Sequence, residues 1–321
     1  MVFSMQGVGN CVAPLLAWAL LSARERLDGV WRLLLAFGAV PFVLTAPLRM
    51  QLSDSLEFTA ARKVRRPTQE WARDIFAEHG RALLGTAGSW FLFDVIFYGN
   101  GLFQADFVEM LEPASERGTH AALVSTARVS FVVSLLGLPG YWAAIACMRD
   151  DLRRQRAIQM AGFGACTLLY AAMSIWFDQV RTRPGLFVAL YGASFFFSNF
   201  GPNATTFILP ACYFPAKHRA VCHGISAAAG KLGALVAAAA FKPCVDTYGP
   251  QIVFAACAVI AASGLLLTWV LVPREPCSRA GLEVAGLDEP LANVVGGEDG
   301  SDEPVAAVLS DHATRDPLGD Q

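Results

Sequence analysis

The sequence predicts an all-α polytopic membrane protein, and its composition and hydropathy pattern are the observations that predict it. Hydrophobic residues make up 55% of the 321 residues, charged residues make up 16%, and the mean hydropathy is +0.44. A soluble protein usually carries about a quarter of charged residues. The apolar residues also occur in blocks long enough to cross a bilayer as helices, separated by short charged loops.

Eight apolar windows predict eight transmembrane helices, at residues 2–21, 30–49, 82–106, 121–148, 157–177, 185–212, 221–241 and 250–273. No signal peptide precedes the first window, because the chain begins almost inside it. The loops after the second, fourth and sixth windows carry more Lys and Arg than the loops between them. The positive-inside rule therefore places these loops and both termini in the cytoplasm.

The windows divide the chain into four segments. Residues 1–49 hold two helices, 50–81 form a cytoplasmic central loop, 82–273 hold six helices, and 274–321 form an acidic tail. The run Arg62–Arg66 in the central loop is interpreted as a basic segment that sets topology, with binding of anionic lipid headgroups as the alternative. The tail is rich in Asp, Glu, Gly and Pro, a composition typical of disordered segments.

Motifs of enzyme and cofactor chemistry are absent from the sequence. The eight cysteines are scattered without a CxxC pair, and the five histidines form no HExxH motif. There is no phosphate-cradling loop before a soluble helix and no Gly-x-Ser-x-Gly elbow. The sequence therefore predicts that the protein is not an enzyme and uses no cofactor, metal or nucleic acid.

Lys231 is a positive charge in the middle of the seventh window. A charge at that depth costs at least about 2.5 kcal/mol, so it normally faces a partner, a cavity or a substrate. The alternative is a lysine at a helix end that extends to the membrane surface. Apolar or small residues continue from Leu232 to Phe241, which favours a functional lysine within the membrane.

Trp90, Asp94 and Tyr98 stand four residues apart in the third window, so on a helix they share one face. Burial and a nearby cation act in opposite directions on the protonation of a carboxylate. That balance suits a group that gains and loses a proton during a transport cycle. The alternative is that the two aromatic residues only pack, and the carboxylate between them favours a site.

The sixth window contains Gly201-Pro202, which predicts a bent or broken helix because proline lacks a backbone N–H. Asn203 and Thr206 follow it and can share a face. Transporters build binding sites at broken helices of this kind. The alternative is a kink that serves packing only.

Three of these segments together resemble the phosphate:proton symporter family of the major facilitator superfamily: Gly85–Gly101, Asn199–Pro210 and His223–Leu235. Two further segments, Val2–Gly7 and Trp31–Pro41, resemble the fifth and sixth helices of that family. The resemblance covers residues 1–273. It implies a partial major facilitator fold, in which the eight windows match helices 5–12 of twelve and the first four helices are missing from an N-terminally incomplete chain.

The resemblance also implies a function and a site. The function is secondary active transport of inorganic phosphate coupled to protons, at the plasma membrane, with phosphate, protons and the lipid bilayer as partners. Asp94 is implied as the proton-coupling group. The phosphate-binding residues implied by the match are Gln6, Trp90, Asp94, Tyr98, Asn203 and Lys231.

The sequence departs from the family in its cytoplasmic loops. Leu52–Glu57 stands where the family usually has Pro-Glu-Ser-Pro-Arg, and Arg153 stands at a position usually held by glycine. Two alternatives therefore stay open. One is a major facilitator transporter of a sugar or organic anion, and the other is a non-transporting membrane fragment that pairs with full-length transporters.

Overall fold

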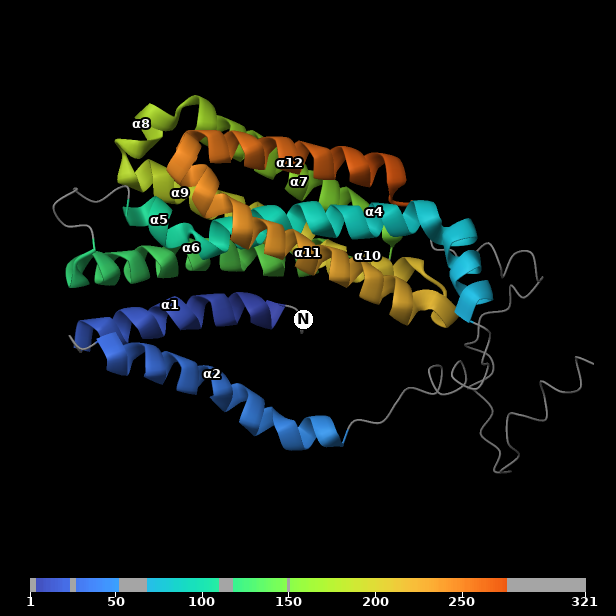
Figure 1. Cartoon of the computed structure of the whole chain (residues 1–321), viewed down its shortest axis with the longest axis horizontal. Helices are drawn as coiled ribbons and strands as arrows, with labels where there is room; N and C mark the ends of the chain where they lie inside the picture. The colour runs from blue at the N-terminus through green and yellow to red at the C-terminus, as the bar shows by residue number, and fades with distance from the viewer. Residues whose placement is uncertain (1–3, 24–26, 52–67, 110–117, 149–150, 276–321) are drawn as a thin grey trace, which may run out of the picture. The chain divides into compact units, whose positions relative to one another are not determined.

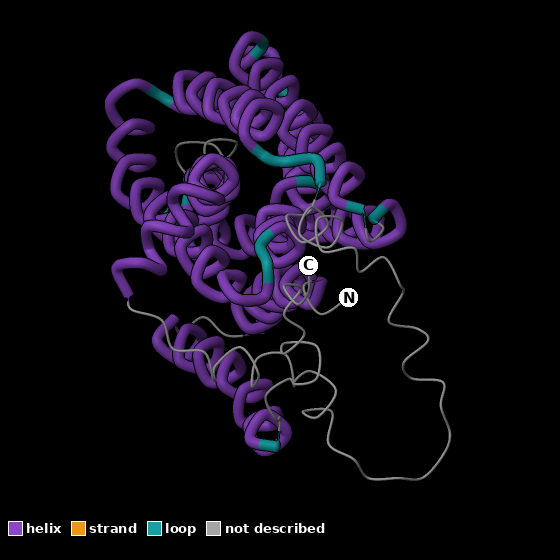
Figure 2. Tube along the Cα trace, turned by 90° about the vertical axis from the view of Figure 1, so that its right-hand side faces the viewer, coloured by secondary structure: helices purple, strands orange, loops and turns teal. Residues whose placement is uncertain are grey.

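The computed structural model describes residues 4–23, 27–51, 68–109, 118–148 and 151–275. Within these ranges the regular secondary structure is entirely α-helical, apart from one residue of 3₁₀-helix at Ser4 (Figures 1 and 2). Two predicted segments fall largely outside these ranges. They are the greater part of the central loop, at 52–67, and the tail from 276 onward.

The described part of the chain contains eleven helices. Their bounds are α1 Met5–Ala23, α2 Leu27–Met50, α4 Thr68–Leu102, α5 Gln104–Glu109, α6 His120–Cys147, α7 Leu152–Ile175, α8 Phe177–Arg181, α9 Pro184–Phe200, α10 Pro202–Tyr213, α11 Ala216–Tyr248 and α12 Pro250–Leu271.

Seven helices of the described part are long and apolar enough to cross a membrane: α1, α2, α4, α6, α7, α11 and α12. The prediction of an all-α polytopic membrane protein is confirmed. The remaining predicted window, 185–212, is occupied by two consecutive shorter helices, α9 and α10. The break lies at Gly201, whose backbone angles of φ −104° and ψ −106° are not helical. The broken helix predicted from Gly201-Pro202 is therefore present.

Helix α4 begins at Thr68, inside the segment predicted as the central loop. Its apolar, membrane-crossing part begins at Ile75. The first turns of α4, before Ile75, carry polar and charged residues, and hydropathy alone does not distinguish such a helical segment from a loop. The helix thus extends beyond its apolar span.

The helices pack in two connected groups. Helix α4 lies against α11 and α12, while α6 lies against α9 and α1, and α7 joins the groups through α12 and α9. Aromatic rings fill the core around Phe254 of α12, which lies 5.0 Å from the ring of Phe107 and 6.4 Å from that of Tyr170. Buried phenylalanines and tyrosines of α4, α7 and α9 complete the same cluster.

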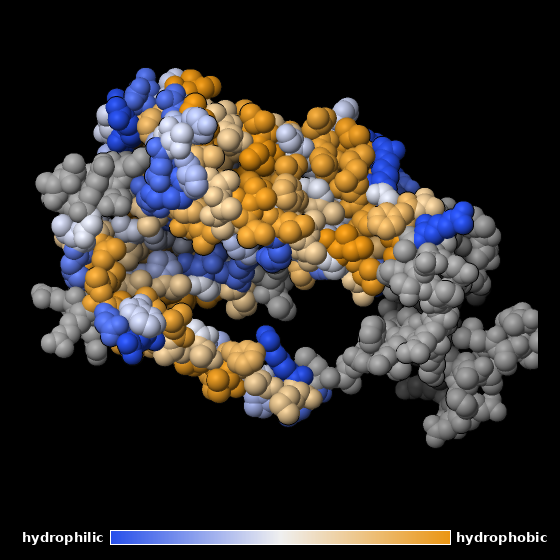
Figure 3. Space-filling model, viewed as in Figure 1, coloured by the Kyte–Doolittle hydropathy of each residue, from blue (hydrophilic) through white to orange (hydrophobic). Residues whose placement is uncertain are grey.

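Small residues allow the broken segment to approach α7 closely. A Cβ atom added to Gly162 would lie 2.6 Å from the Cα of Gly201, so both positions require glycine. Close approach at small residues is a common way for membrane helices to pack. Figure 3 shows hydrophobic residues over the middle of the face formed by α11 and α12, with hydrophilic residues toward its ends, as expected of a membrane-spanning surface.

Candidate functional site

Lys231 of α11 lies beside two of the residues predicted to accompany it. Its Nζ donates a hydrogen bond of 3.0 Å to the hydroxyl of Tyr98 and lies 3.6 Å from Oδ2 of Asp94. The same ammonium lies 4.7 Å from the centre of the Tyr98 ring, within the range of a cation–π interaction. The structure therefore brings a cation, a carboxylate and a phenol together between α4 and α11.

Two glycines of α11 make this proximity possible. A Cβ atom at Gly230 would overlap the indole ring of Trp90 and lie 2.9 Å from Oδ2 of Asp94. One turn further, a Cβ atom at Gly233 would overlap the backbone of Phe91. The absence of side chains at these positions lets α11 lie directly against the face of α4 that carries Trp90 and Asp94.

Trp90 is buried on the same face and packs against aromatic residues from two other helices. Its ring lies edge-on to His223 of α11 at 5.6 Å and to Phe207 of α10 at 6.2 Å. These contacts place Trp90 at the junction of α4, α10 and α11. The indole thus has a packing role as well as its position beside Asp94.

The two charged groups differ strongly in exposure. The side chain of Asp94 is 4% exposed, whereas that of Lys231 is 65% exposed. Among the described residues, Oδ2 of Asp94 has no hydrogen-bond donor and its closest cation is Lys231. The buried carboxylate is held in the helix interface, while the ammonium is accessible to a ligand.

Gln6 and Asn203 form a second group with two residues that were not predicted. Asn203 Nδ2 donates to Oε1 of Gln6 at 3.3 Å, to the hydroxyl of Tyr141 at 2.7 Å and to Oδ1 of Asn199 at 2.8 Å. The Tyr141 hydroxyl in turn donates to Gln6 Oε1 at 3.2 Å. A polar network thus connects α1, α6, α9 and α10.

A cavity of about 390 Å³ lies between the two groups. Tyr98 of the first group lines it together with Tyr141 and Asn199 of the second, and no charged residue is part of its lining. Its polar lining also includes Asn10, Gln104, Ser130 and Ser134. The predicted residues therefore fall into two clusters, and Tyr98 of the first cluster faces the same cavity as Tyr141 and Asn199 of the second.

Comparison with known proteins supports the sequence resemblance. No family model matches the chain. A probable inorganic phosphate transporter 1-12 from Oryza sativa subsp. japonica is 34% identical in an alignment that covers 79% of this chain and 55% of that protein. Inorganic phosphate transporter 1-1 from Arabidopsis thaliana is 34% identical in an alignment that covers 75% of this chain and 56% of that protein.

This chain is a homologue of the plant inorganic phosphate transporters. A third relative, inorganic phosphate transporter 1-11 from Oryza sativa subsp. japonica, is 34% identical over 89% of this chain and 61% of its own length. The predicted resemblance to phosphate transporters of the major facilitator superfamily is confirmed. The chain spans about half the length of the curated relatives that it matches.

The contacts of Gln6 and Asn203 add Tyr141 and Asn199 to the candidate site, and the sequence analysis did not include these two residues. Asn199 had a usable signal, because it stands four residues before Asn203 in the same polar segment. Tyr141 had none, because its contacts are with residues 135 and 62 positions away in the chain. In the described part of the chain, no group of three His, Cys, Asp or Glu side chains is placed to hold a metal ion.

Proposed function

We propose that this chain binds inorganic phosphate at Lys231 and takes part in its proton-coupled transport across a membrane. The observation that carries the proposal is the position of the Lys231 ammonium, 3.0 Å from the Tyr98 hydroxyl and 3.6 Å from the Asp94 carboxylate, in a helix that is long enough to cross a membrane. The names of the homologues, all inorganic phosphate transporters, support the choice of anion.

Phosphate recognition would use the charge of Lys231 and neutral donors around it. An ammonium supplies a charge-assisted hydrogen bond to a phosphate oxygen, and the Tyr98 hydroxyl and Trp90 indole supply uncharged ones. The amides of Gln6 and Asn203 are bonded to Tyr141 and Asn199, which line the cavity, and Asn203 Nδ2 is now shared among three acceptors. A phosphate oxygen would replace one of these acceptors.

Asp94 is proposed as the proton-coupling group. In its charged form it attracts Lys231 and competes with phosphate for the ammonium. Protonation removes this competition, so phosphate binds Lys231 more readily when Asp94 holds a proton. Release of the proton restores the ion pair and favours phosphate departure. Phosphate and the charged form of Asp94 compete for the Lys231 ammonium, so the binding of phosphate is coupled to the binding of a proton.

The proposed orientation places both termini and the loop between α6 and α7 in the cytoplasm of a plasma membrane, on the basis of the Lys and Arg distribution. Cys147 is exposed at the end of α6, beside this loop. In a variant that keeps only this cysteine, an impermeant maleimide should label inside-out vesicles and not right-side-out ones. The opposite pattern would reverse the orientation.

Uptake of radiolabelled phosphate into proteoliposomes tests the proposed function. Lys231→Gln should lower phosphate affinity by about 10- to 100-fold, as expected for loss of one hydrogen bond to a charged group. Lys242→Gln is the matched control, because Lys242 lies in the same helix and pairs with Asp106 and Asp246 instead.

Two results would overturn the proposal. One is uptake by Lys231→Gln equal to that of the unchanged protein. The other is uptake that excess sugar suppresses and excess unlabelled phosphate leaves unchanged, which would favour a transporter of another solute.

A further inference from the structure

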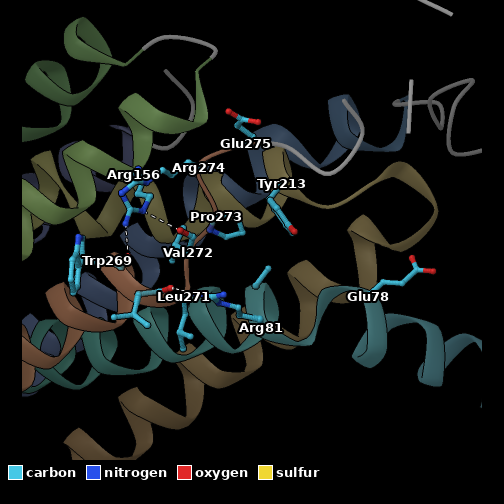
Figure 4. Close-up of a pocket in the computed structure, with 12 residues that line it drawn as sticks. Glu78, Arg81, Arg156, Tyr213, Trp269, Leu271, Val272, Pro273, Arg274 and Glu275 are labelled. Atoms are coloured by element: carbon cyan, nitrogen blue, oxygen red, sulfur yellow. Dashed lines mark hydrogen bonds between the residues drawn. The ribbon is translucent and has the colours of Figure 1, made fainter. Parts of the chain in front are cut away.

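A second pocket lies beside the C-terminal end of α12 (Figure 4). It shares no lining residue with the group formed by Lys231, Asp94 and Tyr98. Its volume is about 620 Å³, and its walls come from α4, α7, α10, the last turn of α12 and the residues that follow α12. Three arginines line it: Arg81 of α4, Arg156 of α7 and Arg274 after α12. This concentration of guanidinium groups has no role in the proposed transport site.

Two of the arginines bind the carbonyl oxygens at the end of α12. Arg156 Nε donates to Val272 O at 3.0 Å and to Thr268 O at 3.3 Å, and its Nη2 donates to Trp269 O at 2.6 Å. Arg81 Nη2 donates to Val270 O at 2.8 Å. The last carbonyls of a helix have no partner within the helix, so the bonds to Trp269, Val270 and Val272 satisfy these carbonyls, while Thr268 O also accepts from the backbone N–H of Val272. Carbonyl oxygens carry only partial negative charges, so these bonds do not neutralise the full positive charges of Arg81 and Arg156.

The arginines lack carboxylate partners within the described residues. No ion pair joins Arg81, Arg156 or Arg274 to an acidic side chain, and Arg274 makes no hydrogen bond there either. Arg274 lies close enough to Arg156 for their like charges to repel, and Figure 4 shows the two side chains next to each other. An anion between them would remove this repulsion.

The two acidic residues of the lining are directed to other groups. Glu275 forms an ion pair with Arg153, which lies outside the lining, and the Glu78 carboxylate lies 3.8 Å from the ring of His79. The neighbourhood therefore holds four arginines against two glutamates. The pocket carries a net positive charge that the described residues do not balance.

The pocket also lies at a level where lipid headgroups are expected. Trp269, which is 57% exposed, and Tyr213 line it at the ends of two helices. Tryptophan and tyrosine gather at the headgroup level of membranes, and basic pockets between transmembrane helices bind phosphorylated headgroups. The apolar residues Leu266 and Val270 are exposed on the adjoining surface of α12, where acyl chains can lie.

We propose that the pocket of Arg81, Arg156 and Arg274 is a binding site for a phosphate-bearing anion, distinct from the site at Lys231. The shared chemistry is a phosphate group held by guanidinium donors, with Arg274 and Arg81 as the adaptable contacts and Arg156 as the fixed one. The ligand is a phosphorylated lipid headgroup or free phosphate, and the two sources are separable by experiment.

The test measures thermal unfolding of the purified full chain with added ligand. Phosphatidylcholine vesicles that contain a phosphatidylinositol phosphate should raise the unfolding temperature relative to phosphatidylcholine alone. Arg274→Gln and Arg81→Gln should each weaken the apparent affinity for this lipid about tenfold, the effect of losing about one charge-assisted hydrogen bond. Arg183→Gln is the matched control, because Arg183 is an exposed arginine that precedes α9 and is not part of the pocket.

Inorganic phosphate is added in a second arm, with the Lys231→Gln background to remove the central site. Stabilisation there that Arg274→Gln abolishes would identify free phosphate as the ligand, and stabilisation only by the lipid would identify the headgroup. Equal responses of Arg274→Gln, Arg81→Gln and the control to both probes would overturn the proposal. Because the readout is binding and not transport, failure here leaves the proposed function unaffected, and the reverse also holds.

Discussion

Lys231 and Arg156 are both cations within membrane-crossing helices, but their charges are balanced in different ways. Lys231 faces a carboxylate, Asp94, whose charge a proton can remove. Arg156 faces three backbone carbonyls, whose dipoles are permanent. The difference separates a cation that can change partner during a transport cycle from one that holds a helix end in place.

The two cations also differ in how far they are exposed. The Lys231 side chain is 65% exposed, while Arg156 is only 8% exposed as a whole residue. A long charged side chain that is buried and fully bonded stabilises the fold, whereas an exposed one beside a cavity is available to a ligand. Substitutions at and around the two cations should therefore have different effects, the largest of them on stability.

The largest effect is expected from Arg156→Gln. This change leaves the carbonyls of Trp269 and Val272 without their arginine donor and leaves Thr268 O with the backbone N–H of Val272 alone. It should destabilise the folded protein by about 3 kcal/mol, within the range for buried polar groups that lose their partners. Thermal unfolding in detergent measures it. Arg154→Gln changes a neighbouring exposed arginine and should leave the unfolding temperature unchanged. Equal unfolding temperatures of Arg156→Gln and Arg154→Gln would show that Arg156 does not hold the end of α12 in place.

Asp94→Asn should abolish coupling to protons. In the unchanged protein, an inward gradient of one pH unit should raise phosphate accumulation in vesicles about tenfold for each coupled proton. Asparagine cannot take up this proton, so the variant should show no response to the gradient. Uptake by Asp94→Asn that stays fully proton-dependent would exclude Asp94 as the coupling group.

Tyr141→Phe should reduce phosphate affinity about fivefold, because loss of one neutral hydrogen-bonding group is worth about 1 kcal/mol. The hydroxyl of Tyr141 is hydrogen-bonded to both Gln6 and Asn203, and Tyr141 lines the cavity together with Tyr98, the partner of Lys231. Equilibrium binding of labelled phosphate measures the change. Tyr248→Phe, at an exposed tyrosine, serves as control. An unchanged affinity would show that the amide network does not act on the ligand.

The smallest effect is expected from Lys242→Gln. Lys242 pairs with Asp106 at 2.7 Å and with Asp246 at 3.1 Å, and its side chain is 47% exposed. Exposed ion pairs contribute less than about 1 kcal/mol, so stability should change by less than that amount and uptake by less than about twofold. A loss of uptake as large as that of Lys231→Gln would show that position within α11, and not the Asp94 partner, determines the result.

The all-helical class could be predicted from the sequence because a segment that crosses lipid must be apolar and must make its backbone hydrogen bonds within itself. The break at Gly201 was also predictable from local chemistry, since proline at position 202 has no N–H to donate. The start of α4 at Thr68 was not, because a polar extension of a helix has no hydropathy signal.

The candidate site was predictable only in part. The four-residue spacing of Trp90, Asp94 and Tyr98 predicted a common face, while the resemblance supplied the pairing with Lys231. Tyr141 and the pocket of Arg156 depend on contacts between distant helices, which neither spacing nor composition encodes. Arg156 in particular is indistinguishable in sequence from Arg153 and Arg154, which precede it and are exposed.

Gly162 and Gly201 meet with no side chain between them, so the start of α10 lies as close to α7 as two backbones permit. One turn further, Thr205 of α10 donates a hydrogen bond of 2.8 Å to Gln159 of α7. Asn203, which holds the amide network of Gln6, Tyr141 and Asn199, lies between these two contacts. A bulky residue at position 201 would push the two helices apart and carry the Asn203 amide away from its partners.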